Sequence, residues 1–236
     1  MKQQTLRPRT WYPWVVLGLA LLTSVIAGAQ TIVPPIAEYR GKIQGQLELR
    51  NDSDAPMAVI LEVHSFKVSS EGSMSYEPVS ADLQLEMGNT SFVIEPGGTH
   101  LVFYKAKVKS KSAWFVITST MTRAVPIRGQ MRINLVLPHV VYLYQKERLK
   151  PQDVTVKLQP TDSATQTLEI VNSTDKLSRL SLVECKGFDK EAESGGVPIF
   201  PGGTRFIKME CGAPRSDAKL KVHFQDGFTL EATRQP

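Results

Sequence analysis

The sequence carries no recognisable catalytic or metal-binding motif. Its four histidines, His64, His100, His139 and His223, lie far apart and lack the spacing that metal ligation needs. It contains no nucleophile-elbow GxSxG, no zinc-binding HExxH and no phosphate-binding GxxxxGK. We therefore expect a protein that is not an enzyme and that uses no cofactor, metal or small-molecule substrate.

Beyond its N-terminal segment, the chain also lacks a large excess of positive or negative charge. The chain contains 28 Lys and Arg against 23 Asp and Glu, a formal net charge of +5. Lys2, Arg7 and Arg9 belong to an N-terminal segment that we expect to be removed, which leaves 25 basic and 23 acidic residues. A nearly neutral mature chain gives no argument for binding nucleic acid.

Cysteine is scarce, and both copies stand late in the chain, at Cys185 and Cys211. Two cysteines in an exported chain are expected to pair with each other. In the chain-entropy description, a disulfide that closes a loop of this length stabilises its domain by about 3 kcal/mol. The sequence therefore predicts one disulfide, in the second half of the molecule.

The N-terminus has the three parts of a secretory signal peptide. A basic start is followed by an uncharged apolar run of 13 residues, Trp14 to Ile26, and then by the small residues Ala27-Gly28-Ala29. The alternative, an uncleaved membrane anchor, needs a span of about 20 apolar residues. We therefore expect residues 1–29 to be a signal peptide cleaved after Ala29, and the mature protein to be exported.

Apolar residues with a helical period of 3.6 are missing beyond the signal. Segments such as LELRN at 47–51 instead alternate apolar and polar residues, as half-buried strands do. Turn clusters follow them, including Asn-Asp-Ser-Asp and Pro-Gly-Gly. Strands that recur about every 10 residues between such turns are typical of β-sandwiches.

An internal repeat indicates two copies of one domain. LELRNDSD at 47–54 resembles LEIVNSTD at 168–175, and IEPGGTHLV at 94–102 resembles IFPGGTRFI at 199–207. The first pair is offset by 121 residues and the second by 105, so the first copy holds 16 extra residues, which the polar segment 67–90 can contain. The prediction is an all-β protein of two tandem immunoglobulin-like β-sandwich domains, residues 30–150 and 151–236, behind the signal peptide.

These motifs together resemble a known family. An apolar strand followed by Asn51-Asp-Ser, then Phe-x-Ile-x-Pro-Gly-Gly-Thr at 92–99, Trp-Phe-x-Ile at 114–117 and a long strand ending Tyr-Leu-Tyr at 142–144 are similar to the periplasmic chaperones of pilus and fimbria assembly, the PapD-like family. The resemblance covers most of residues 33–236. It implies that the exported chain resides in the periplasm, that it has a protein client of the pilus or fimbrial subunit kind, and that an outer-membrane usher is a further partner.

Residues 131–145, MRINLVLPHVVYLYQ, form the longest predicted strand, and its end is apolar on both faces. One face can enter the core of its own domain, whereas the other needs a second domain or a partner to cover it. In the family that the chain resembles, the matching strand is an exposed edge that is lent to an incomplete subunit by β-augmentation. The resemblance implies a client-binding strand whose contact residues are Ile133, Leu135, Leu137, Val141 and Leu143.

One part of the family pattern is missing. Those chaperones bind the client's terminal carboxylate with a Lys in this strand and an Arg on the first strand. Between Ile133 and Gln145 this chain has no Lys or Arg, and the first strand offers only Arg40 as a candidate carboxylate anchor. A desolvated carboxylate needs a paired cation. The alternative is therefore a secreted structural or adhesion module of two immunoglobulin-like domains, without chaperone activity, whose apolar strand is simply buried.

Overall fold

The computed structural model describes residues 30–41, 43–108, 112–125, 133–159, 165–190 and 193–234. The predicted signal peptide at 1–29, and residues Met131 and Arg132 of the predicted long strand, lie outside the described residues. In the described part of the chain, no helix has the length and apolar character required to span a membrane.

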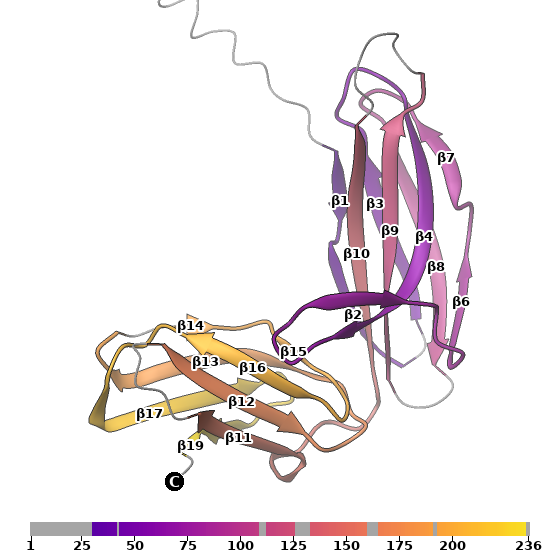
Figure 1. Ribbon diagram of the computed structural model, residues 1–236. Helices are drawn as coiled ribbons and strands as arrows, with labels where there is room; N and C mark the ends of the chain where they lie inside the picture. Colours follow the sequence, from indigo (N-terminus) through magenta and orange to yellow (C-terminus); the bar gives the residue numbers. More distant parts are fainter. Residues whose placement is uncertain are drawn as a thin grey trace, which may run out of the picture.

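The first domain is a sandwich of two β-sheets, which stands upright in Figure 1. One sheet has the order β1-β3-β8-β6; the other has the order β2-β10-β9-β4-β5, with β7 also paired to β4. The inner faces carry the apolar residues that the alternating sequence predicted, such as Leu47, Val59, Phe115 and Ile117. The strands are β1 (Thr31–Val33), β2 (Ile36–Arg40), β3 (Ile43–Arg50), β4 (Met57–Val68), β5 (Met74–Glu77), β6 (Leu83–Met87), β7 (Ser91–Ile94), β8 (Thr99–Val108), β9 (Ala113–Arg123) and β10 (Asn134–Tyr144).

The second domain repeats this plan, and its strands are fewer and shorter among the described residues. Its sheets have the orders β16-β12-β11-β19 and β14-β13-β17-β18, with β15 paired to β13. The predicted boundary at Lys150-Pro151 falls between β10 and β11, at a short 3-10 turn, η1 (Pro151–Asp153). The strands are β11 (Val154–Gln159), β12 (Gln166–Asn172), β13 (Ser178–Phe188), β14 (Glu193–Ser194), β15 (Pro198–Ile199), β16 (Thr204–Met209), β17 (Pro214–Phe224), β18 (Thr229–Glu231) and β19 (Thr233–Arg234).

The two repeated motifs meet in space in the first domain. Asn51, at the end of β3, is fully buried, and its side-chain amide donates to the carbonyls of Ala55 at 2.8 Å and Ile94 at 2.9 Å. Its backbone N–H donates to the carbonyl of Gly98, in the Pro-Gly-Gly turn. The preceding Gly97 has φ of +67°, a left-handed conformation that favours glycine. The asparagine thus joins the β3–β4 loop to the turn before β8.

The second domain builds the same junction. Asn172 is fully buried, and its amide donates to the carbonyls of Lys176 and Phe200, while its backbone N–H donates to Gly203. In both copies the asparagine carboxamide oxygen accepts from the residue two positions later, Ser53 or Thr174. The two sequence blocks therefore recur together because each supplies half of one hydrogen-bonded unit.

The predicted disulfide is present in the second domain. Cys185 on β13 and Cys211 after β16 are bonded, and both are buried in the domain core. The extra residues of the first domain, which we placed at 67–90, form the end of β4 together with β5 and β6. Of these, β6 extends the first sheet beside β8, whereas the β4–β5 hairpin reaches toward the second domain.

The two domains meet at an angle, with β2 at the boundary between them (Figure 1). The chain leaves β1 at Pro34-Pro35 and changes sheets, so that β1 pairs with β3 and β2 pairs with β10. This change of sheet decides which part of β10 has a neighbour on its outer edge.

Candidate functional site

The strand β10 has two different surroundings along its length. Over nearly its whole length it pairs with β9, antiparallel. On its other edge it pairs with β2, parallel, and only from Val140 to Tyr144. In the part of the chain that the structure describes, no strand pairs with this outer edge between Asn134 and Pro138.

The backbone direction along this open edge follows from one hydrogen bond. The N–H of Val140 donates to the carbonyl of Pro35 at 2.9 Å, so Val140 directs its backbone groups to the outer edge. Alternate residues of a strand direct their backbone groups to the same edge. The backbone groups of Asn134 and Val136 therefore also face outward, where an added strand would lie.

The predicted contact residues fall into two groups. Ile133, just before β10, is 71% exposed, whereas Leu135 and Leu137 are half-buried and pack at the margin of the first domain's core. Val141 and Leu143 have the same parity but are 0% exposed inside that core. The structure therefore leaves Ile133, Leu135 and Leu137 near the surface and encloses the other two.

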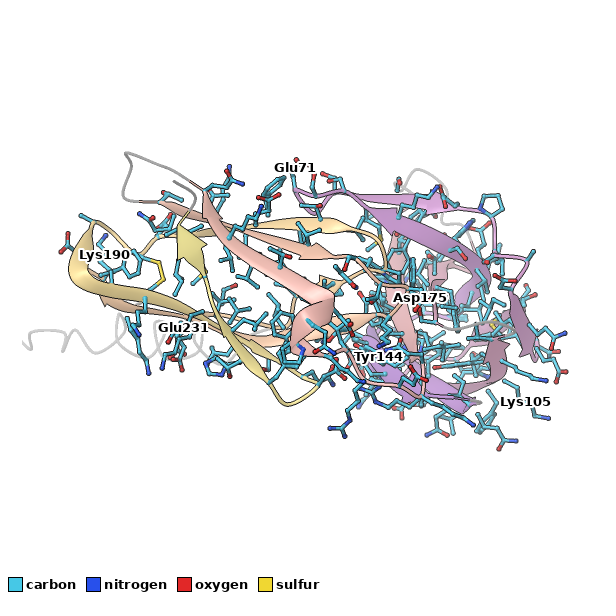
Figure 2. The ribbon with its side chains drawn as sticks, turned by 90° about the horizontal axis from the view of Figure 1, so that it is seen from below. Glu71, Lys105, Tyr144, Asp175, Lys190 and Glu231 are labelled. Atoms are coloured by element: carbon cyan, nitrogen blue, oxygen red, sulfur yellow. A yellow bond between two sulfur atoms is a disulfide. The ribbon has the colours of Figure 1, made fainter. Side chains whose placement is uncertain are left out.

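The opposite face of β10 is covered at its C-terminal end by the second domain. Tyr142 and Tyr144 are buried in a small cluster with Phe66 and Leu177. Phe200, from the second domain, packs edge-on against Phe66 with ring centroids 6.2 Å apart. Figure 2 shows Tyr144 at the junction of the two domains. The second apolar face that the sequence predicted for this strand is thus covered within the chain.

His139 marks the point where the open part of the edge ends. It is fully buried; its Nδ1 lies against the carbonyl of Pro34, and its Nε2 is 2.9 Å from the hydroxyl oxygen of Tyr104. A carbonyl can only accept, so Nδ1–H donates to Pro34 and the neutral Nε2 accepts from Tyr104. Burial lowers the pKa of His139, although the Pro34 carbonyl opposes this shift. The neutral imidazole therefore joins β10 to the connection between β1 and β2 by a hydrogen bond.

The candidate anchor Arg40 lies at the domain boundary and already has a carboxylate partner. Its guanidinium is 3.0 Å from Oδ1 of Asp226 in the second domain, and it also donates to the carbonyl of Gln145. The Asp226 side chain is 1% exposed and also accepts from the hydroxyl of Ser178. The Arg40 guanidinium further lies over the ring of Tyr144, 5.2 Å from its centroid.

A second ion pair crosses the boundary, and here the carboxylate belongs to the first domain and the arginine to the second. Oε1 of Glu38, on β2, lies 3.0 Å from Nε of Arg179 of the second domain in an ion pair, and it accepts a hydrogen bond from the hydroxyl of Tyr144 at 3.0 Å. Arg179 lies over the ring of Tyr142, 5.3 Å from its centroid. Each domain thus contributes one arginine and one carboxylate to the boundary. Each of the two guanidinium groups lies over the ring of a tyrosine of β10.

A third contact closes the other side of the boundary. The guanidinium of Arg205, on β16, donates to the carbonyl of Ser69 at 2.9 Å, and the N–H of Phe206 donates to Ser70 at 2.8 Å. Both acceptors lie in the β4–β5 hairpin, where Figure 2 labels Glu71. Gly72, at the tip of this hairpin, has φ of +101°, a left-handed conformation that favours glycine, and a Cβ atom there would displace the guanidinium.

We expect the Arg40–Asp226 pair to contribute about 2 kcal/mol to the association of the two domains. A buried carboxylate that loses its cation is strongly destabilised, and the partial exposure of Arg40 reduces this value. The measurement is a double-mutant cycle of Arg40→Met and Asp226→Asn, followed by denaturant unfolding. The exposed pair Lys67–Glu77 serves as a control and should couple by less than about 1 kcal/mol. Equal coupling in the two pairs would contradict the assignment.

Sequence reasoning missed most residues of this boundary. Glu38, Arg179 and Asp226 lie far apart in the chain and belong to no motif. Phe200 could have been found, because it interrupts the repeat: its counterpart in the first domain is the exposed Glu95. A charged turn residue replaced by a phenylalanine in the second copy indicates a contact that only the second copy makes.

Comparisons with known proteins agree on the fold. No protein-family model matches the chain, and no curated protein matches its sequence. Among solved structures, the class 5 fimbriae chaperone CfaA is similar, with a TM-score of 0.57 and 7% identity over 88% of this chain and 100% of that chain. The chaperone YadV has a TM-score of 0.53 and 10% identity over 86% of this chain and 97% of that one.

A third similar structure is the CsuC–CsuE complex of a chaperone with a tip adhesion subunit, from Acinetobacter baumannii. It has a TM-score of 0.52 and 13% identity, over 88% of this chain and 100% of that chain. At such identities the likeness establishes the fold. The prediction of two tandem immunoglobulin-like domains in the arrangement of fimbrial chaperones is thereby confirmed.

Proposed function

We propose that this chain is a periplasmic chaperone that binds exported clients of the pilus or fimbrial subunit kind by strand addition to β10. The observation that carries the proposal is the outer edge from Asn134 to Pro138, which has no strand partner in the described part of the chain. Unpaired edges promote aggregation, so a protein is expected to keep one only where it has a use. The fold shared with fimbrial chaperones supports the proposal.

The side chains proposed to contact the client are Ile133, Leu135 and Leu137. They alternate along the strand in step with the core residues Val141 and Leu143, and they lie on the part of the strand that does not pair with β2. A client strand added beside them would extend the sheet. The rest of the client would then cover Ile133, Leu135 and Leu137, just as the domain core covers Val141. Backbone hydrogen bonds would supply affinity, and these alternate side chains would supply apolar contact.

Arg40 remains the proposed anchor for a terminal carboxylate of the client, with one added condition. Because Asp226 occupies the guanidinium in the free chain, a client carboxylate has to compete with a buried intramolecular partner. The anchor would therefore contribute less than a free arginine in the same place. An outer-membrane usher is the further partner that this proposal implies.

A second candidate function is favoured by the burial at the end of β10. Tyr142 and Tyr144 are covered by the second domain, as expected of a secreted structural or adhesion module without a client. The two functions differ in what they require of the open edge. A chaperone needs Ile133 to contact a client, whereas a structural module gives it no role.

The test is co-purification of the tagged chain from the periplasm with the charge variant Ile133→Asp. Ile133 is 71% exposed, so the variant should fold. We expect a fimbrial-type subunit to co-purify with the unaltered chain, and at least about tenfold less of it with Ile133→Asp, because a carboxylate would be buried against the apolar client.

The matched control is Val136→Asp, which introduces the same charge three residues away. Val136 is 54% exposed but points to the outer face of the sheet, away from the domain core. Client recovery with this variant should stay within about twofold, as for surface changes in general. Undiminished recovery with Ile133→Asp, or no subunit with any folded variant, would favour the structural module.

A further inference from the structure

A proline stands at the C-terminal end of the open edge of β10, two residues before the pairing with β2 begins. Pro138 pairs opposite Thr118 of β9, and it shares the parity of Val140, whose N–H points to the outer edge. The nitrogen of Pro138 therefore faces outward, where it has no hydrogen to donate. The pairing with β9 loses nothing, because the residues whose backbone groups face β9 are Leu137 and His139.

The open edge thus offers two donors and three acceptors. The N–H groups of Asn134 and Val136 face outward, and the carbonyls of Asn134, Val136 and Pro138 face the same way. A short strand that pairs beside Asn134 and Val136 finds a complete ladder. A strand that extends as far as Pro138 meets the pyrrolidine ring and leaves one of its own carbonyls without a donor.

A second copy of the chain is the strand that this arrangement opposes most. If two copies of the edge 134–138 pair antiparallel about a two-fold axis at Val136, Asn134 of each lies opposite Pro138 of the other. Each of the two Asn134–Pro138 pairs would normally form two backbone hydrogen bonds. Because proline has no N–H, each pair can form only one. The symmetric pair therefore loses two of its six backbone hydrogen bonds.

We propose that Pro138 restricts the open edge of β10 to a short client strand and prevents its pairing with a second copy of the chain. The client part of this inference rests on the proposed function; the part concerning self-association rests on the open edge alone. Exposed apolar side chains at Ile133 and Val136 would otherwise favour such pairing. The proline removes hydrogen bonds from a long pairing and leaves those of a short one intact.

The experiment compares self-association of the full mature chain with that of Pro138→Val, by sedimentation over a range of concentrations. The substitution restores one outward N–H per copy, so the symmetric pair gains two hydrogen bonds. We expect the dimer dissociation constant to fall at least about tenfold. Pro138→Ala restores the same donor with a smaller side chain and should act in the same direction.

The matched control is Thr120→Val. Thr120 lies directly opposite Val136 on β9, and its side chain shares the outer face. This variant makes that face more apolar and adds no backbone donor. If Thr120→Val dimerises as strongly as Pro138→Val, the effect belongs to hydrophobicity and the inference fails. It also fails if both Pro138 variants sediment as the unaltered chain does.

Hydrogen exchange separates failure of this inference from failure of the proposed function. In the free chain, the amides of Asn134 and Val136 should exchange fast, whereas those of Leu135, Leu137 and His139 should be protected by β9. In the Pro138→Val dimer, Asn134 and Val136 should become protected. If these two amides are already protected in the free monomer, the edge is covered and both proposals fail. If they exchange fast but the variants do not dimerise, only the role of Pro138 is refuted.

Discussion

Replacing Asn51 by alanine is expected to lower the free energy of unfolding of the first domain by about 3 kcal/mol. The side chain is 0% exposed and donates to the carbonyls of Ala55, Ile94 and Glu95, at 2.8, 2.9 and 3.2 Å. Its oxygen accepts from the N–H and the hydroxyl of Ser53. Alanine would remove this donor from the buried carbonyl of Ile94 and would leave the carbonyl of Ala55 with the hydroxyl of Ser53 as its side-chain donor.

The same substitution in the second copy provides an internal comparison. Asn172→Ala should destabilise the second domain by a similar amount, because Asn172 makes the equivalent contacts. Hydrogen-exchange mass spectrometry measures the two domains separately in one experiment. Asn89→Ala, at an exposed loop position, is the control and should change neither domain by more than about 0.5 kcal/mol. A loss below about 1 kcal/mol for both buried asparagines would contradict the role assigned to them.

Removing the disulfide is expected to lower the free energy of unfolding of the second domain by about 3 kcal/mol. The bond joins residues separated by 26 positions, so the reduced unfolded chain gains the freedom of a loop of that size. Both sulfur atoms belong to buried residues of the core formed by β13, β16 and β17. The measurement compares hydrogen exchange before and after reduction, or with Cys185→Ala combined with Cys211→Ala.

The first domain is the natural control for this experiment, because it contains no cysteine. Protection in β3 and β8 should be unchanged by reduction, while protection in β13 and β17 falls. Equal losses in both domains would show that they unfold as one unit, through the boundary formed by Arg40, Asp226 and Phe200. That outcome would overturn the expectation of a local effect.

Many strands could be predicted because their residues alternate. LELRN at 47–51, which alternates apolar and polar residues, covers the end of β3 and the buried Asn51 that follows it. A period of two places every second side chain on the core face, and the apolar residues then have one arrangement that buries them. The repeat of Asn and Pro-Gly-Gly-Thr was equally visible, although its hydrogen bonds show why the two blocks recur together.

The candidate site could be predicted only in part. The strand and the parity of its apolar residues were readable, and Ile133, Leu135 and Leu137 lie on its open portion. The enclosure of Val141 and Leu143 could not be predicted. Alternation shows which face of the strand a side chain occupies, but it does not show which element pairs with the outer edge of β10. That depends on the change of sheet at Pro34-Pro35, which brings β2 beside the end of β10.

By itself, the sequence determined that this protein is made of paired β-sandwiches, where its main strands run, and that its two cysteines lie in one domain. These properties follow from local patterns, in which neighbouring residues carry the information. Only the tertiary structure decided that the outer edge of β10 is open at one end and covered at the other, and that Arg40 faces Asp226, 186 positions away. Contacts over such separations arise from how the sheets and domains pack, and no local pattern of residues encodes them.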